Sequence, residues 1–171
     1  MKIFNLLTRL GLAAALTTLT ITVANADTID GTAIATVIAP LSIVEDSTMN
    51  FGSLSGGPLL GTVILNVSGG RTTTGDAQIL GAGAGSAAAF TITGASGQAY
   101  SLSYTAGTLS DGSGNTMAVD TFTDDASGSL TGATESFAAG ATLHVGVDQT
   151  AGAYSTAAGG GSAYSITVNY N

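Results

Sequence analysis

Short runs of alternating apolar and polar residues recur along the chain, and turns rich in glycine and serine separate them. After residue 26 we find no sustained apolar repeat at helical spacing. The alternation predicts about nine strands, at residues 33–44, 49–54, 60–67, 77–80, 88–93, 99–105, 116–123, 141–147 and 163–170. Such a series is typical of an all-β fold, and we expect an immunoglobulin-like antiparallel β-sandwich of about eight to nine strands.

Residues 1–26 have the pattern of a secretory signal peptide. Lys2 and Arg9 make the start basic, residues 10–23 are apolar, and the stretch ends in the small-residue motif ANA. The apolar run is shorter than a membrane-spanning helix requires. We therefore expect a cleaved signal peptide followed by a single exported β-sandwich domain, residues 27–171, with no membrane span. Its expected location is the periplasm, the cell surface or the extracellular space.

Charge and composition narrow the classes of partner. All eleven acidic residues but only one basic residue, Arg71, follow the predicted cleavage site, so the exported part has one cation against eleven anions and a net charge of −10. A chain of this charge repels phosphate, which excludes nucleic acid as an expected partner. The chain has no cysteine, so the core and the backbone hydrogen bonds must hold the exported domain without disulfides.

No catalytic or cofactor motif stands out. His144 is the only histidine, and its alternation with Leu143 and Val145 predicts that it faces away from the core. The chain lacks the GxSxG motif of serine hydrolases. The glycines in GAGAG (81–85) precede a predicted strand instead of the helix that a dinucleotide-binding loop requires. We therefore expect no enzyme activity and no cofactor.

Acidic side chains gather around the turn at residues 111–125. Carboxylate and amide oxygens are the ligands that calcium prefers, but their spacing here does not match an EF-hand loop. The weak candidates for a calcium site are Asp111, Asn115, Asp120, Asp124 and Asp125, and the alternative is a solvated turn. These residues motivate a second functional hypothesis, a monomeric surface module that binds glycans or proteins with calcium as a candidate cofactor.

The two ends of the predicted domain carry the main functional hypothesis. Tyr164, Ile166, Val168 and Tyr170 share one face of a strand that continues almost to the last residue. This strand is either the last one of a complete sandwich or an edge that awaits a partner strand. We expect residues 27–38 to be a donor strand or an edge strand, and one face of this segment carries Ile29, Gly31, Ala33, Ala35 and Val37. Such a segment could add to the sheet edge of a neighbouring copy, and head-to-tail addition of this kind makes filaments.

Several stretches resemble the DUF4402 family of small exported bacterial proteins over essentially the whole exported chain: GTAIATVIAPLSIVEDSTMNFGSLSGG, AAFTITGASGQAYSLSY, TMAVDTFT, GATLHVGVDQTAGAYS and YSITVNYN. The early Asn50-Phe51-Gly52 and the penultimate Tyr170 are also similar to spore-coat-U and chaperone–usher pilus subunits. That looser resemblance implies a sandwich that lacks one strand. It also implies that the C-terminal apolar set faces a periplasmic chaperone and that the N-terminal set is the donor strand for the next subunit. We therefore expect a fimbria-like or surface-coat subunit that assembles by strand addition.

Overall fold

The computed structural model describes residues 26–81 and 85–171, and the chain divides into two units, Met1–Thr36 and Val37–Asn171. Nearly all of the predicted signal peptide lies outside the described residues. In the first unit, the described residues 26–36 form no strand and are exposed. The second unit contains every strand described below.

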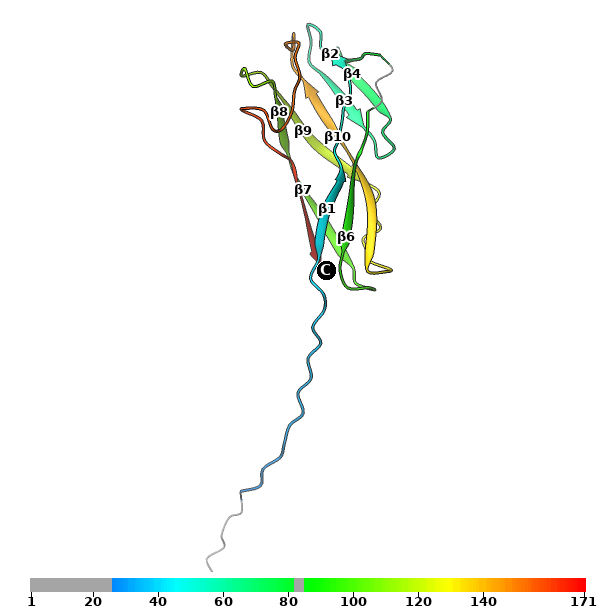
Figure 1. Ribbon diagram of the computed structural model, residues 1–171, viewed down its shortest axis with the longest axis vertical. Coiled ribbons are helices and arrows are strands. Elements are labelled where there is room, and N and C mark those ends of the chain that lie inside the picture. The colour runs from blue at the N-terminus through cyan, green and yellow to red at the C-terminus, as the bar shows by residue number, and fades with distance from the viewer. Residues whose placement is uncertain (1–25, 82–84) are drawn as a thin grey trace, which may run out of the picture. The chain divides into compact units, whose positions relative to one another are not determined.

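The described part of the chain is all-β and antiparallel (Figure 1). Its strands are β1 (Ser42–Ser47), β2 (Leu54–Ser55), β3 (Gly61–Leu65), β4 (Arg71–Gly75), β5 (Gln78–Ile79), β6 (Ala88–Thr93), β7 (Tyr100–Thr105), β8 (Gly107–Ser110), β9 (Thr116–Asp124), β10 (Thr134–Val145) and β11 (Ser165–Tyr170). Among these residues, no helix is long and apolar enough to cross a membrane.

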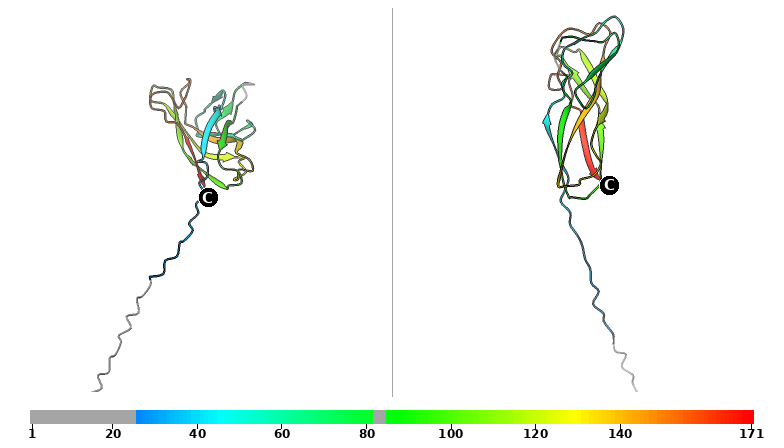
Figure 2. Two further views of the ribbon diagram at one scale, coloured as in Figure 1. Left: turned by 60° about the horizontal axis from the view of Figure 1, so that its bottom comes forward. Right: turned by 90° about the vertical axis from the view of Figure 1, so that its right-hand side faces the viewer.

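Seven strands form one curled sheet, and the remaining four form two small pairs. The large sheet runs β1-β6-β10-β3-β4, and β9 pairs with β10 and with β8. The pair β11-β7 and the pair β2-β5 are separate from it in hydrogen bonding. Figure 2 shows β11 in red beside β7. Strand β1 is therefore an edge strand of the large sheet, and β11 is an edge strand of its pair with β7.

Most predicted strands are confirmed, and three were missed. The prediction for residues 88–93 matches β6, and those for 60–67, 99–105, 116–123 and 163–170 overlap their strands closely. Strands β4 and β8 and the first half of β10 were not predicted. The prediction of extended structure from residue 33 is wrong as a strand assignment before Ser42, because residues 26–41 belong to no strand.

Strand β10 is the centre of the sheet because it changes partners along its length. Its first half pairs with β6 up to Ala139, and its second half pairs with β3 from Ala141. Gly140 lies at the change, where a Cβ atom would overlap the carbonyl oxygen of Leu65. Only glycine lets the two backbones approach this closely, which is the reason for a glycine inside the longest strand.

A bulge in β9 corrects one detail of the predicted strand. Thr121 has a left-handed φ of 51°, and Thr121 and Phe122 together oppose the single residue Ala141 of β10. A bulge of this kind moves the residues after it to the other face of the sheet. Phe122 therefore lies on the same face as Val119, half-buried, whereas Thr121 is exposed. Strict alternation along the strand would instead place Thr121 with Val119 and Phe122 on the opposite face.

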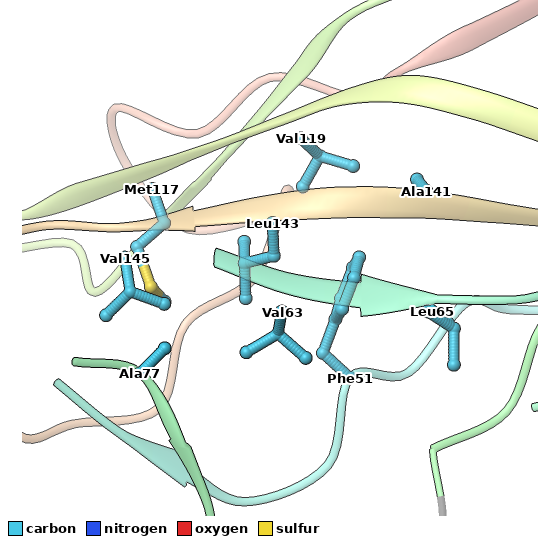
Figure 3. Packing of buried hydrophobic residues seen from close by; sticks show 9 residues of the cluster. All are labelled: Phe51, Val63, Leu65, Ala77, Met117, Val119, Ala141, Leu143 and Val145. Carbon is cyan, nitrogen blue, oxygen red and sulfur yellow. The ribbon is translucent and has the colours of Figure 1, made fainter. Parts of the chain in front are cut away.

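Two apolar clusters form the core. Figure 3 shows the first, which gathers Ala77 and side chains from β3, β9 and β10 around Phe51; the strand residues are Val63, Leu65, Met117, Val119, Ala141, Leu143 and Val145. The second contains Ala88, Phe90, Ile92, Tyr100, Leu130, Phe137 and Ala139. Side chains of β1, β7 and β11 pack against the second cluster. Phe90 and Phe137 are cross-strand neighbours whose ring centroids lie 5.4 Å apart.

Candidate functional site

A groove of about 940 Å³ opens over both core clusters. Its first bank consists of Ile43 and Glu45 of β1 and continues through residues 48–56. Its second bank consists of residues 149–156, Ala163, Tyr164 and Ile166. Core side chains form its floor, namely Phe90, Leu109, Met117, Val119 and Leu143. We call this site the β1–β11 groove.

The sequence Asn50-Phe51-Gly52 shapes the first bank locally. The Asn50 side-chain oxygen accepts a hydrogen bond from the Gly52 N–H at 2.7 Å, and Gly52 has a left-handed φ of 67°. This tight turn points the Phe51 ring into the core, where 7% of it is exposed. Arg71 donates to the carbonyl oxygens of Phe51 at 2.7 Å and Ser53 at 3.4 Å. The single cation of the predicted exported part thus holds this bank in place.

Strand β11 presents unpaired backbone groups to the groove. The Asn171 N–H donates to the Ala99 carbonyl at 3.1 Å, and these two residues lie opposite each other in the register of β11 with β7. In antiparallel pairs, hydrogen-bonded and non-hydrogen-bonded positions alternate. The N–H and C=O groups of Ile166, Val168 and Tyr170 therefore point away from β7, toward the free edge of β11.

Strand β1 presents a second free edge by the same reasoning. The Gly94 N–H donates to the Ala133 carbonyl at 2.9 Å, in register with the pairing of β6 and β10. The backbone N–H and C=O groups of even-numbered residues of β6 therefore point toward β10, and those of odd-numbered residues point toward β1. The backbone groups of Ile43 and Glu45, which lie opposite even-numbered residues of β6, therefore point away from it. The groove thus lies beside two rows of available donors and acceptors.

A third edge, that of β8, is closed by the chain itself. The N–H and C=O groups of Thr108 exchange hydrogen bonds of 2.8 and 2.9 Å with Ser162, and those of Ser110 exchange two of 2.9 Å with Ser155. Folded proteins generally protect edge strands, because unpaired edges recruit other chains. Unlike β8, strands β1 and β11 each have an edge with no partner among the described residues, and both strands border the groove.

The structure places the predicted acceptor residues on one face and leaves the predicted donor residues exposed. Tyr164, Ile166, Val168 and Tyr170 are all half-buried, and the residues between them are exposed. Every residue of the predicted donor set is exposed and outside any strand, namely Ile29, Gly31, Ala33, Ala35 and Val37. The exposed fraction is 95% for Ile29 and 96% for Val37. Whether these residues donate a strand stays a prediction.

The acidic residues named as weak calcium candidates do not converge. Asp111 accepts hydrogen bonds from its own turn, including the Asn115 side chain at 2.6 Å, and these bonds lower the pKa of Asp111. Asp124 accepts from the Tyr104 hydroxyl at 2.6 Å, and Asp125 accepts from a backbone N–H of β10. Among the described residues, no group of three or more acidic or histidine side chains is arranged to hold a metal ion.

His144 pairs with the remaining acidic candidate, Asp120, on the outer face of the sheet. The His144 Nε2 lies 2.8 Å from the Asp120 carboxylate, and both side chains are more than 40% exposed. The hydrogen bond with His144 and a second one from Thr121 lower the pKa of Asp120. Leu143 and Val145 on either side of His144 are buried, so the predicted orientation of the histidine is confirmed. This pair lies outside the residues that line the β1–β11 groove.

The model of the family described as "Domain of unknown function (DUF4402)" matches residues 41–170. The chain belongs to the DUF4402 family. This result confirms the family resemblance drawn from the sequence. The DUF4402 match begins one residue before β1 and ends with the last residue of β11. No curated protein and no solved structure matches the chain.

Sequence reasoning found one bank of the groove and missed the other. The alternation in residues 163–170 identified the face of β11, but no signal marked Ile43 and Glu45 as the facing edge. Their role depends on which strand β1 pairs with, and pairing is not readable from the pattern of one strand. The Asn50-Phe51-Gly52 motif was noted for its resemblance to pilus subunits, and its geometric role in the first bank came only from the structure.

Proposed function

We propose that this DUF4402 protein is a non-catalytic, exported structural subunit of a fimbria-like or surface-coat assembly. The segment 27–39 of one copy would add as a strand in the β1–β11 groove of the next copy. The observation that carries this proposal is the pair of free strand edges, β1 and β11, on either side of one apolar groove. In the chain itself, the segment 26–36 is exposed and forms no strand.

The strand order supports an incomplete sandwich. We interpret β1-β6-β10-β9 as the four-stranded layer of an immunoglobulin-like fold and β7-β11 as the opposite layer. A complete immunoglobulin domain has three strands in that second layer. The missing strand would lie beside β11, which is the edge that faces the groove. One added strand would therefore complete the fold and satisfy the backbone groups of both edges.

The chemistry of the segment supports it as the added strand. Residues at every second position from 29 to 39 are apolar or glycine, whereas the more polar opposite face carries Asp30, Thr32 and Thr36 together with Ile34 and Ile38. In strand addition, main-chain hydrogen bonds give affinity and alternate side chains fill pockets. The six residues of β11 need a partner of about 20 Å, and 13 residues can supply about 43 Å when extended.

The test places the same negative charge on either face of the segment, at the neighbouring residues 32 and 33. We compare the full chain with its Ala33→Asp variant, which places a carboxylate on the apolar face. A Thr32→Asp variant carries the same charge on the polar face and serves as the matched control. Burial of an unpaired charge in an apolar groove is costly, so we expect Ala33→Asp to weaken self-association at least about tenfold and Thr32→Asp to preserve it.

Self-association is measured by sedimentation velocity over a range of concentrations and by ladders of multimers on unboiled gels. Deletion of residues 27–35 should also abolish the ladders and leave a folded monomer, as circular dichroism would report. A full chain that is monomeric at every concentration refutes the proposal, and so do unchanged multimers in Ala33→Asp.

A further inference from the structure

Two tyrosine hydroxyls link the chain around β11 to the chain around β1, one at the groove and one beyond it. The Tyr164 hydroxyl, immediately before β11, donates to the Glu45 carboxylate of β1 at 3.1 Å. At the other end of β11, the Tyr170 hydroxyl donates to the Ala39 carbonyl at 2.8 Å. Between these two contacts, no hydrogen bond joins the described residues of β1 to those of β11. The two open edges are therefore held together by side chains alone.

The ring of Tyr164 is fixed in position by a stack of aromatic side chains. Its centroid lies 5.4 Å from that of Phe122, which in turn lies 5.1 Å from that of Tyr104 at an interplanar angle of 10°. Burial and the neighbouring Glu45 carboxylate raise the pKa of Tyr164. The hydroxyl thus stays protonated at neutral pH and remains a donor toward Glu45.

This contact lies on the path of an incoming strand. Glu45 directs its backbone groups into the groove, and Tyr164 and Glu45 both line it. A strand inserted between two others requires their backbones to stand about 9.6 Å apart, twice the spacing of neighbouring strands. A hydrogen bond that draws the Glu45 and Tyr164 side chains together across the opening must break or reorient before the strand can pair with both edges.

We propose that the hydrogen bond between Tyr164 and Glu45 is a latch that closes the β1–β11 groove in the free subunit and must open before the strand of a second copy can enter. This inference rests on the proposed function, because it concerns access to the same groove. The latch slows association with the strand and contributes nothing to the complex once the strand is in place.

The experiment measures how fast the groove takes up a strand. The full chain carries Ala33→Asp, so that it cannot donate its own segment, and the probe is a fluorescently labelled peptide with the natural sequence of residues 27–40. Stopped-flow anisotropy gives the association and dissociation rates separately. Tyr164→Phe removes the hydroxyl and keeps the ring stacked on Phe122, whereas Glu45→Ala removes the acceptor.

We expect Tyr164→Phe and Glu45→Ala each to raise the association rate about fivefold, the effect of one hydrogen bond of ordinary strength. The double variant should be no faster than either single variant, because both remove the same interaction. The control is Thr62→Val, which also removes a hydroxyl, since the Thr62 hydroxyl hydrogen-bonds to that of Thr74 and neither residue lines the groove. It should leave the association rate unchanged.

The outcomes separate the latch from the proposed function. Peptide binding with an unchanged or lower association rate in Tyr164→Phe overturns the latch and leaves strand addition intact. Additive effects of the two substitutions also overturn it, because they would show that the residues act independently. If the peptide binds none of the proteins, strand addition is refuted and the latch falls with it.

Discussion

The Tyr170 hydroxyl ties the C-terminal strand β11 to two other segments, and a variant without this hydroxyl tests that packing directly. Its hydroxyl accepts a hydrogen bond from the Ala95 N–H at 2.6 Å and donates one to the Ala39 carbonyl at 2.8 Å. Gly94 allows this approach, because a Cβ atom there would lie 2.6 Å from the hydroxyl oxygen. One side-chain atom thus joins β11, the turn after β6 and the segment that leads into β1.

The substitution Tyr170→Phe removes both hydrogen bonds and keeps the ring. Each bond of this kind contributes roughly 0.5–1.5 kcal/mol, and both lie at partly buried or exposed positions, so we expect a loss of about 1–2 kcal/mol in the free energy of unfolding. For a domain of this size, that loss lowers Tm by about 2–8 °C. The Ala95 amide, left without its acceptor, should also exchange with solvent faster.

Urea denaturation gives the free energy, and hydrogen exchange followed by NMR gives the protection of the Ala95 amide. The control is Tyr154→Phe, which also removes a hydroxyl with two hydrogen bonds but leaves Ala95 untouched. A change of less than about 0.3 kcal/mol in Tyr170→Phe, within the range of neutral surface substitutions, together with unchanged exchange at Ala95, would refute the role assigned to this hydroxyl.

Three further predictions follow from other parts of the domain. Gly140→Ala should lower the free energy of unfolding by about 3 kcal/mol or more, because the new Cβ overlaps a β3 carbonyl; Gly132→Ala, where no atom lies closer than 4.0 Å, should be neutral in the same urea titration. His144→Ala should raise the pKa of Asp120 toward its usual value in an NMR titration. Because that pKa is lowered in the folded state of the natural chain, the Asp120 carboxylate stabilises the fold above about pH 4, and this stabilisation is lost as pH falls. Burial raises the pKa of Tyr104 in the folded state. The protonated Tyr104 hydroxyl therefore stabilises the fold below about pH 10, and this stabilisation is lost as pH rises. Tyr104→Phe should remove one late-ionising tyrosine from an absorbance titration and make the loss of stability at alkaline pH less steep.

The strands that the sequence predicted are those with one buried face. In β6 and β11 every second residue is buried or half-buried, and the alternation of side chains reports it directly. The sequence RTTTG of β4 has no such alternation, because β4 is a polar edge strand. The first half of β10 begins with the polar residues Thr134, Glu135 and Ser136 and continues into Ala138, Ala139 and Gly140, and such a succession of polar and small residues looks like a loop.

The groove could be predicted only in part, because it depends on pairing between distant segments. Its banks come from residues 43–56 and 149–166, more than ninety positions apart. Alternation identifies the buried face of β11, but it carries no information about which edge has a partner. The bulge at Thr121 illustrates the same limit, since a single left-handed residue moved Phe122 to the inner face, where it supports the ring of Tyr164.

The open edges of β1 and β11 are the feature that a self-sufficient domain would have removed. Natural proteins protect such edges with lysine, proline, bulges or covering loops. This chain uses a covering loop at β8, and β1 carries two acidic residues and a register irregularity between Glu45 and Ser47, whereas β11 contains no charged residue or proline. Residues 27–171 contain a single cation, Arg71, which is engaged at the first bank of the groove, so lysine-type protection is not available to either edge. The high negative charge disfavours random contact between copies at long range, whereas the core side chains that form the floor of the groove are uncharged. These conditions favour one specific strand over general aggregation, and they are the physical basis on which we propose that the groove serves subunit assembly.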